Sequence, residues 1–133
     1  MDMMLGQTPA TLDSATVDKE HQVQIGMLDA FYTLVEQDES QFKIQEMLNQ
    51  LIAYSEMHFM SEQLLMRMYA YPDYDDHVLD HEAMIEYLNQ IKERYLAGEK
   101  QFALDTATEM RKFLLAHVGS RDEAFSKYLT STP

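Results

Sequence analysis

The chain contains no cysteine and no tryptophan, and it has only 4 glycines and 3 prolines among 133 residues. Without cysteine, the chain forms no disulfide and offers no thiolate to a metal. The few glycines and prolines lie near the expected ends of secondary-structure elements, and no repeat, low-complexity tract or linker divides the sequence. We therefore expect residues 1–133 to form one domain, which is long enough to bury a core.

Basic residues are also scarce, with 10 lysines and arginines against 23 aspartates and glutamates and a net charge of −13. Such a surface repels phosphate backbones and anionic lipid, so we expect no nucleic-acid partner and no membrane insertion. No apolar stretch is long enough to span a bilayer. The first residues lack the basic segment and long apolar core of a signal peptide, which favours a cytoplasmic location. The polar outer faces of the expected helices favour a monomer, although Tyr54 and Tyr87 could serve an interface.

Five histidines are present, and all of them fit one pattern. Neutral imidazole and carboxylate together suit transition metals such as iron, manganese or zinc. Five imidazoles and two carboxylates are too many for a single tetrahedral zinc. The pattern therefore predicts a two-metal site, formed by a lone His21, the pairs His58-x-x-x-Glu62 and His77-x-x-x-His81, and His117-x-x-x-x-Asp122.

The apolar residues recur at alternating spacings of three and four, which predicts helices packed lengthwise. Four such stripes run through residues 21–35, 44–69, 77–95 and 103–117. Pro72 separates the second helix from the third, Gly98 fits a left-handed cap after the third, and Ser40 fits the N-cap of the second. Short connections make neighbours antiparallel, so we predict an all-α, up-down-up-down four-helix bundle over 17–129, with an N-terminal arm (1–16) and a short C-terminal helical segment.

The bundle topology brings the polar residues of all four helices to one end. His58 and Glu62 lie one turn apart on the apolar face of the second helix, and His77 and His81 do the same on the third. His21 near the start of the first helix and His117 near the end of the fourth reach the same layer. Burying these groups without a partner would cost several kcal/mol each (~2–7), so the layer indicates bound metal.

The five-residue spacing from His117 to Asp122 does not suit a regular helix. Five steps of about 100° place Asp122 about 140° around from His117, so both cannot face the same seam. Gly119 lies between them and tolerates a widened turn or a break. We predict that residues 118–121 leave ideal α-helical geometry.

A motif runs from Leu51 to Met66 and continues through Tyr71-Pro72-Asp73 to His77 and His81. It reappears at Phe113-Leu114-Leu115-Ala116-His117 and Asp122. This combined motif closely resembles the hemerythrin family. The resemblance covers residues 17–129, and the short chain looks like the single-domain bacterial members. It implies reversible O2 binding at two non-haem irons, for O2 storage, delivery or sensing, with no enzyme activity and no catalytic residue. By the same resemblance, His77, His81 and His117 hold one iron, His21 and His58 hold the other, and Glu62, Asp122 and an oxo or hydroxo group bridge them.

That arrangement leaves one coordination position free on the two-histidine iron, where the family binds O2. The resemblance implies an apolar pocket there, and Phe59, Phe113, Leu114 and Val118 are candidates for its wall, although each also suits ordinary core packing. The family's usual tryptophans are missing, with Phe113 expected in place of one. Gln63 occupies a position where a second glutamate is common.

Two other functions remain open at this stage. A di-iron enzyme could act on peroxide or nitric oxide, but no extra acid or base is placed near the ligands and oxidising di-iron bundles are richer in carboxylates. An iron- or O2-responsive interaction module would usually need a partner domain, and the sequence shows none. If the protein delivers O2, an O2-consuming protein is the expected recipient. A copper site built from Met57, Met60, Met66 and Met68 is not expected, because methionine usually fills core space.

Overall fold

The structure is a computed structural model that describes residues 14–131, and within that range every secondary-structure element is helical. Four long helices are followed by a short π-helical turn and a final helix. They are α1 (Ser14–Glu36), α2 (Gln41–Met68), α3 (Tyr74–Leu96), α4 (Lys100–His117), η2 (Val118–Asp122) and α5 (Glu123–Ser131). None of these described helices is long and apolar enough to cross a membrane.

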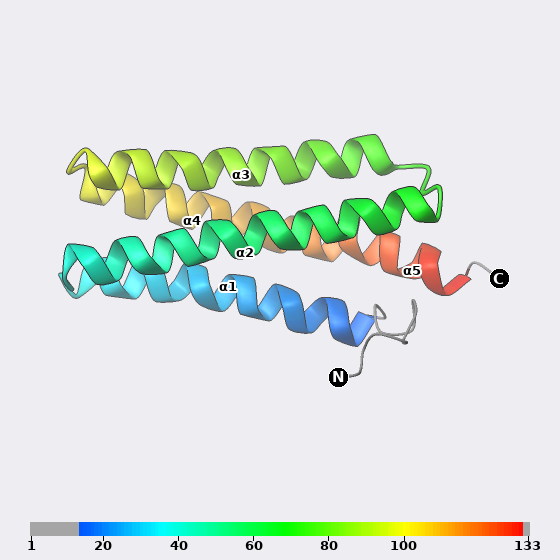
Figure 1. Cartoon of the computed structure of the whole chain (residues 1–133), viewed down its shortest axis with the longest axis horizontal. Helices are drawn as coiled ribbons and strands as arrows, with labels where there is room; N and C mark the ends of the chain where they lie inside the picture. The colour runs from blue at the N-terminus through cyan, green and yellow to red at the C-terminus, as the bar shows by residue number, and fades with distance from the viewer. Residues whose placement is uncertain (1–13, 132–133) are drawn as a thin grey trace.

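The four long helices run lengthwise, and each is antiparallel to the next along the chain (Figure 1). Helix α1 packs against α2 and α4, and α3 packs against α2 and α4, so the helices form a closed ring of neighbours. The predicted up-down-up-down bundle is confirmed. Helix α1 already begins at Ser14, within the segment expected as an arm; the arm's earlier residues, 1–13, lie outside the described part.

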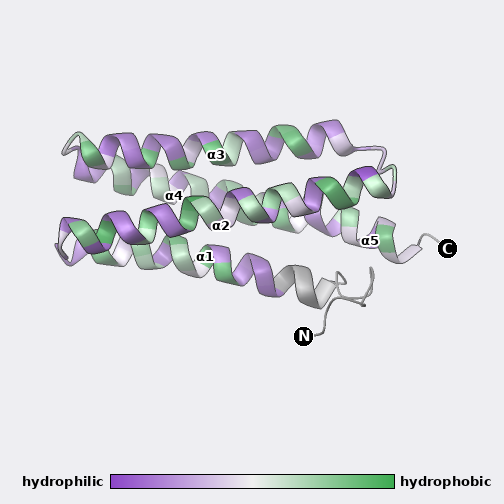
Figure 2. Ribbon diagram, viewed as in Figure 1, coloured by the Kyte–Doolittle hydropathy of each residue, from purple (hydrophilic) through white to green (hydrophobic). Residues whose placement is uncertain are grey.

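The core consists of two apolar clusters at different heights of the bundle. The main cluster fills most of its length, around Leu28, Leu48, Leu88 and Met110. A smaller cluster of Met66, Tyr71 and Phe125 closes the end where α5 lies. Along α2, α3 and α4 the histidines fall between the two clusters. The histidine layer is thus enclosed by apolar residues on both sides. Hydrophilic and hydrophobic residues alternate along the helix ribbons (Figure 2).

All three connections between the four long helices end the preceding helix with the same hydrogen-bonded cap. In each, a residue in the left-handed region follows the helix, and the next N–H reaches back to the third-last helical carbonyl, as in a Schellman motif. Gly98 has φ of 83° and is followed by the Glu99 N–H to Arg94 O bond of 2.9 Å, as predicted. Asp38 and Ala70 take the equivalent positions with φ of 53° and 52°. The sequence did not reveal these two caps, because neither carries glycine.

The remaining predicted boundaries are confirmed. Ser40 caps α2 through its hydroxyl, which accepts a hydrogen bond of 3.2 Å from the Lys43 N–H. The break between α2 and α3 lies at residues 69–73, around Pro72.

The methionines near the site differ from their expected role as core filler. Met66 is fully buried, but Met57, Met60 and Met68 are 60–69% exposed on the outer face of α2. Together with Leu64 they form an apolar strip at helical spacing. The prediction that Met57, Met60 and Met68 fill the core was therefore wrong. In this part of α2 the face toward the core holds His58 and Glu62 instead.

The fourth helix widens into the π-helical turn η2 between His117 and Asp122 and then continues as α5. The predicted departure from α-helical geometry is confirmed. A π turn holds about one residue more than an α turn, which brings Asp122 back to the face occupied by His117. Gly119 has no left-handed φ, and a methyl group added there would meet nothing within 4 Å. The widening therefore does not depend on glycine, and the chain does not break there.

The cap at Ala70 gives a stability prediction. Replacing Ala70 by glycine should raise the free energy of unfolding by about 1 kcal/mol, because glycine adopts the left-handed region without the steric cost that a Cβ brings. The control is Ala97→Gly, since Ala97 ends α3 in a right-handed conformation and should lose stability. Urea denaturation measures both. Equal destabilisation by the two substitutions would contradict the assigned cap.

The π turn gives a second prediction, for which Gly119 and Gly26 are a matched pair. Both are exposed and helical, and both have space for a methyl group. Each Gly→Ala change should therefore stabilise the protein by roughly 1 kcal/mol, the difference in helix propensity, without lowering bound metal per chain. Thermal unfolding and metal analysis test this. Loss of metal in Gly119→Ala but not in Gly26→Ala would show that the turn requires glycine.

Candidate metal site

All seven residues singled out from the sequence lie in one buried layer, and none of them is more than 7% exposed. Each of the four long helices contributes, and η2 adds the last carboxylate. The layer lies at the end of the bundle that holds the α2–α3 connection and α5 (Figure 1). The convergence predicted from the topology is thus present: His21 comes from α1, His58 and Glu62 from α2, His77 and His81 from α3, His117 from α4 and Asp122 from η2.

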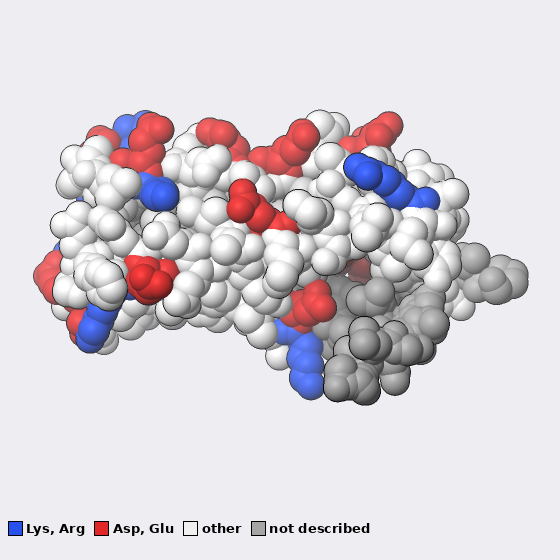
Figure 3. Space-filling model, viewed as in Figure 1, with Lys and Arg blue, Asp and Glu red and all other residues white. Residues whose placement is uncertain are grey.

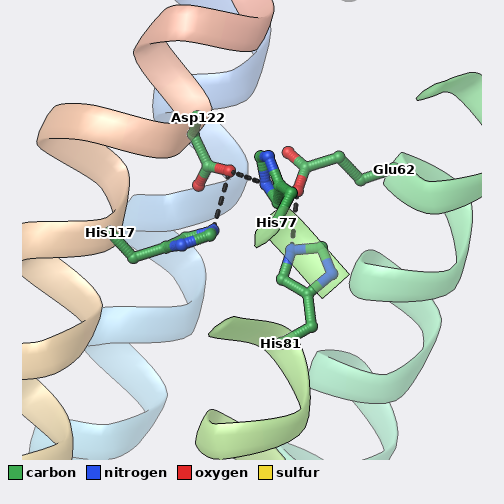
Figure 4. A group of neighbouring side chains, drawn as sticks. All are labelled: Glu62, His77, His81, His117 and Asp122. Carbon is green, nitrogen blue, oxygen red and sulfur yellow. Dashed lines mark hydrogen bonds and ion pairs between the residues drawn. The ribbon is translucent and has the colours of Figure 1, made fainter. Parts of the chain in front are cut away.

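Five of these side chains form the larger of two groups that could hold an ion, and Figure 4 shows them converging from α2, α3, α4 and η2. The Glu62 carboxylate lies between two imidazoles, with its Oε1 2.9 Å from His77 Nε2 and 2.8 Å from His81 Nε2. The Asp122 Oδ1 lies 2.7 Å from His77 Nε2 and 2.9 Å from His117 Nε2. Three imidazoles and two carboxylates therefore surround one small volume.

The second group contains His21, His58 and, again, Glu62. The rings of His21 and His58 lie edge to face with centroids 5.2 Å apart. Asp122 also reaches this side, because its Oδ2 lies 2.7 Å from His21 Nε2 while its Oδ1 faces the other group. The histidines are thus divided three and two, with both carboxylates between the groups.

The inward-facing nitrogens lack the hydrogen bonds that a metal-free structure would need. The His58 Nε2 is buried and has no hydrogen-bond partner among the described residues, and the Nε2 atoms of His21 and His117 lie close only to the Asp122 carboxylate there. Buried polar atoms in proteins are almost always paired, and neutral imidazole nitrogen is a common ligand of transition metals. The donor set and its unpaired atoms therefore fit a two-metal centre.

Three histidines are fixed from behind by hydrogen bonds from their Nδ1 atoms. His58 Nδ1 donates to Glu20 Oε1 at 2.7 Å, His81 Nδ1 to Gln63 Oε1 at 2.9 Å and His117 Nδ1 to Asp80 Oδ2 at 2.9 Å. Such contacts hold the Nε2 of each ring toward a metal and raise its basicity.

Sequence reasoning missed Glu20 and Asp80 and set Gln63 aside because it is not a ligand. A signal was available, since Glu20 and Asp80 each directly precede a histidine of the pattern. Asp80 also accepts a hydrogen bond of 3.2 Å from Arg121 Nε, which links α3 to η2.

The electrostatics of the layer favour ionised carboxylates. Burial alone would raise the pKa of Asp122, but hydrogen bonds from His117, His21 and His77 outweigh it and hold that pKa far below its usual value. Burial opposes ionisation of Glu62 too, yet His77 and His81 keep its pKa lowered. Burial would lower the pKa of His77, but the bonds to Asp122 and Glu62 raise it to about 9. Both carboxylates are therefore charged at neutral pH.

The four residues expected around an O2 pocket lie close to this layer. Leu114 is fully buried one turn before His117, and Phe59 stacks on His81 with ring centroids 4.2 Å apart. Phe113 and Val118 are only partly buried and pack against the main core, with Phe113 beside Tyr87 of α3.

Comparison with known proteins supports the interpretation of this layer as a metal site. The chain resembles "Bacteriohemerythrin" of Methylococcus capsulatus (strain Bath), with 28% identity over 89 residues that cover 67% of this chain and 68% of that protein. It also resembles "Bacteriohemerythrin" of Stenotrophomonas maltophilia, with 23% identity over 95% of this chain and 81% of that protein. No solved structure matches significantly. The Hemerythrin HHE cation binding domain matches residues 12–129, so the chain belongs to the hemerythrin family.

Proposed function

We propose that the protein binds dioxygen reversibly at a non-haem di-iron centre, for O2 storage, delivery or sensing, and that it is not an enzyme. The observation that carries the proposal is the division of five buried histidines into three and two around shared carboxylates. The names of the two relatives support it. Iron is preferred to manganese or zinc because of the family, since the donor set suits all three.

In this proposal, the three-histidine group holds one iron and the two-histidine group holds the other. Glu62 and Asp122, which lie between the two groups, would serve both ions, together with an oxo or hydroxo group. The ion held by His21 and His58 would then have fewer protein ligands than the other and would keep a position for an added ligand. The iron pair supplies the electrons and the coordination position that O2 needs. The protein's own residues bind, orient and shield that pair.

The layer excludes water while keeping a way in for a small ligand. Main-core residues such as Leu114 and Phe59 lie on one side of it, and the end cluster lies on the other. A cavity of about 230 Å³ borders His58 and Glu62 and is lined mostly by apolar side chains, among them Met57, Leu64 and Leu65. An apolar path suits O2 and admits few protons. Because proton delivery promotes irreversible oxidation, this surrounding favours reversible binding.

Oxygen cycling tests the proposal. The iron-loaded protein is reduced, exposed to O2 and deoxygenated repeatedly while its visible spectrum is followed. We expect a stable oxygenated spectrum that disappears and returns over several cycles. Rapid conversion to the ferric form, or turnover of added peroxide, would favour an enzyme instead.

Two neighbouring substitutions sharpen this experiment. His58→Ala removes one imidazole from the two-histidine group and should abolish the oxygenated spectrum. Met60→Ala changes an exposed side chain that does not line the cavity beside His58 and should leave the spectrum unchanged. Normal cycling in His58→Ala would contradict the assigned O2 site.

Metal uptake should also release protons at neutral pH. With a pKa of about 9, His77 is protonated in the metal-free protein at pH 7.5 and must lose that proton to bind iron. Iron affinity should therefore rise as pH increases from 7 toward 9, and this gain should level off above the pKa. Calorimetric titration in two buffers of different ionisation enthalpy measures the released protons. Identical heats in both buffers at pH 7.5 would contradict the raised pKa.

A further inference from the structure

A buried polar pair lies within the apolar region next to the histidine layer. Gln24 and Ser55 are both 0% exposed, and the Gln24 Nε2 donates a hydrogen bond of 2.8 Å to the Ser55 Oγ. The other end of the Gln24 amide, Oε1, is buried and has no hydrogen-bond partner among the described residues. A buried amide with one unpaired end costs stability. This pair is therefore unlike ordinary core packing.

The pair lies one turn from both histidines of the smaller group. Gln24 follows His21 by three residues on α1, and Ser55 precedes His58 by three residues on α2. Because α1 and α2 are antiparallel, both residues are displaced in the same direction, toward the main core. The displacement is about 4.5 Å along the axis, which a glutamine side chain can span. The layer of side chains one turn from the histidines, on the side of the main core, forms the floor of the site. Gln24 and Ser55 are the residues of this floor on the helices that carry His21 and His58.

The rest of that floor cannot form hydrogen bonds through its side chains. On the other helices the corresponding positions hold Leu114 and Met84, which are fully buried, and Phe59 lies beside His58. The Gln24 amide can face either way, since the Ser55 hydroxyl both accepts and donates. If Ser55 donates to the amide oxygen, the amide NH2 is the free end. It can then donate to an anion.

We propose that Gln24, held by Ser55, is a specificity-determining residue that hydrogen-bonds a small ligand at the two-histidine metal and favours anionic ligands there. The inference deepens the proposed function and rests on it for the position of the metal. The unpaired end of the amide, which burial alone leaves unexplained, acquires a partner when such a ligand binds. The floor is then polar at one point and is not the uniformly apolar wall that the family resemblance implies.

Azide binding to the iron-loaded, diferric protein tests this inference. Gln24→Leu keeps the approximate size of the side chain and removes both polar atoms. We expect its azide dissociation constant, measured by visible absorption titration, to rise about tenfold, because a hydrogen bond to a charged group is lost. The same variant should unfold at a higher urea concentration when metal-free, since the unpaired amide is gone. The matched control is Gln22→Leu, an exposed glutamine on the same helix, which should leave azide affinity unchanged.

An azide affinity of Gln24→Leu within twofold of the wild type overturns the proposal, whatever its stability. If that variant fails to fold, Ser55→Ala takes its place. It retains the amide but removes its anchor and should weaken azide binding several-fold, whereas Ser55→Thr keeps the hydroxyl and should restore it. Equal affinities of the Ser55 variants and the wild type would also overturn the proposal.

The azide and oxygen experiments fail independently. Azide binds the oxidised protein and requires no reversible O2 binding. Loss of oxygen cycling with an intact dependence of azide affinity on Gln24 would refute the O2 function and leave this inference standing. Normal oxygen cycling with no effect of Gln24→Leu on azide would do the reverse.

Discussion

The carboxylate of Asp122 is the point on which the arrangement of the bundle end depends. Its two oxygens lie 2.7–2.9 Å from imidazole nitrogens of His21, His77 and His117, which come from α1, α3 and α4. Glu62, the other carboxylate, forms its close pairs with His77 and His81 of a single helix, α3. Asp122 can take its position only because η2 rotates the chain after α4. The π turn is therefore part of the candidate metal site. It also sets the direction of α5, which follows it directly.

Burying seven ionisable side chains in one layer is unfavourable unless something pairs with them. In the metal-free chain the histidines and carboxylates partly compensate each other, as the lowered pKa of Asp122 shows. The His58 Nε2 remains without a partner among the described residues even so. Metal binding supplies the missing partners, so its free energy adds to that of folding. The apolar main cluster keeps the helices together along the rest of their length. Acidic side chains are scattered over the visible face and cover more of it than basic side chains do (Figure 3).

The four helices and the seven polar residues were predictable because each depends on periodicity along one helix and on the short connections between helices. Even the irregular turn before Asp122 followed from counting residues per turn. Features that depend on contacts between particular side chains of different helices were missed. Glu20 and Asp80 orient histidines of other helices, and Gln24 finds Ser55 across the α1–α2 interface. The caps at Asp38 and Ala70 were missed for another reason, since glycine is the usual sequence signal of a left-handed cap and neither position holds it.

The two groups of histidines have different surroundings. Around the three-histidine group, Phe59 stacks on His81, and Tyr71 and Phe125 lie against His77 with ring centroids 6.4 and 6.2 Å away. Two hollows nevertheless border this side, one at His81 and the other at His117. The two-histidine side borders the cavity at His58 and the polar pair below it. Access from the surface therefore does not distinguish the two groups. The chemistry of their neighbours does, because aromatic rings lie against the larger group and a buried amide and hydroxyl lie next to the smaller one.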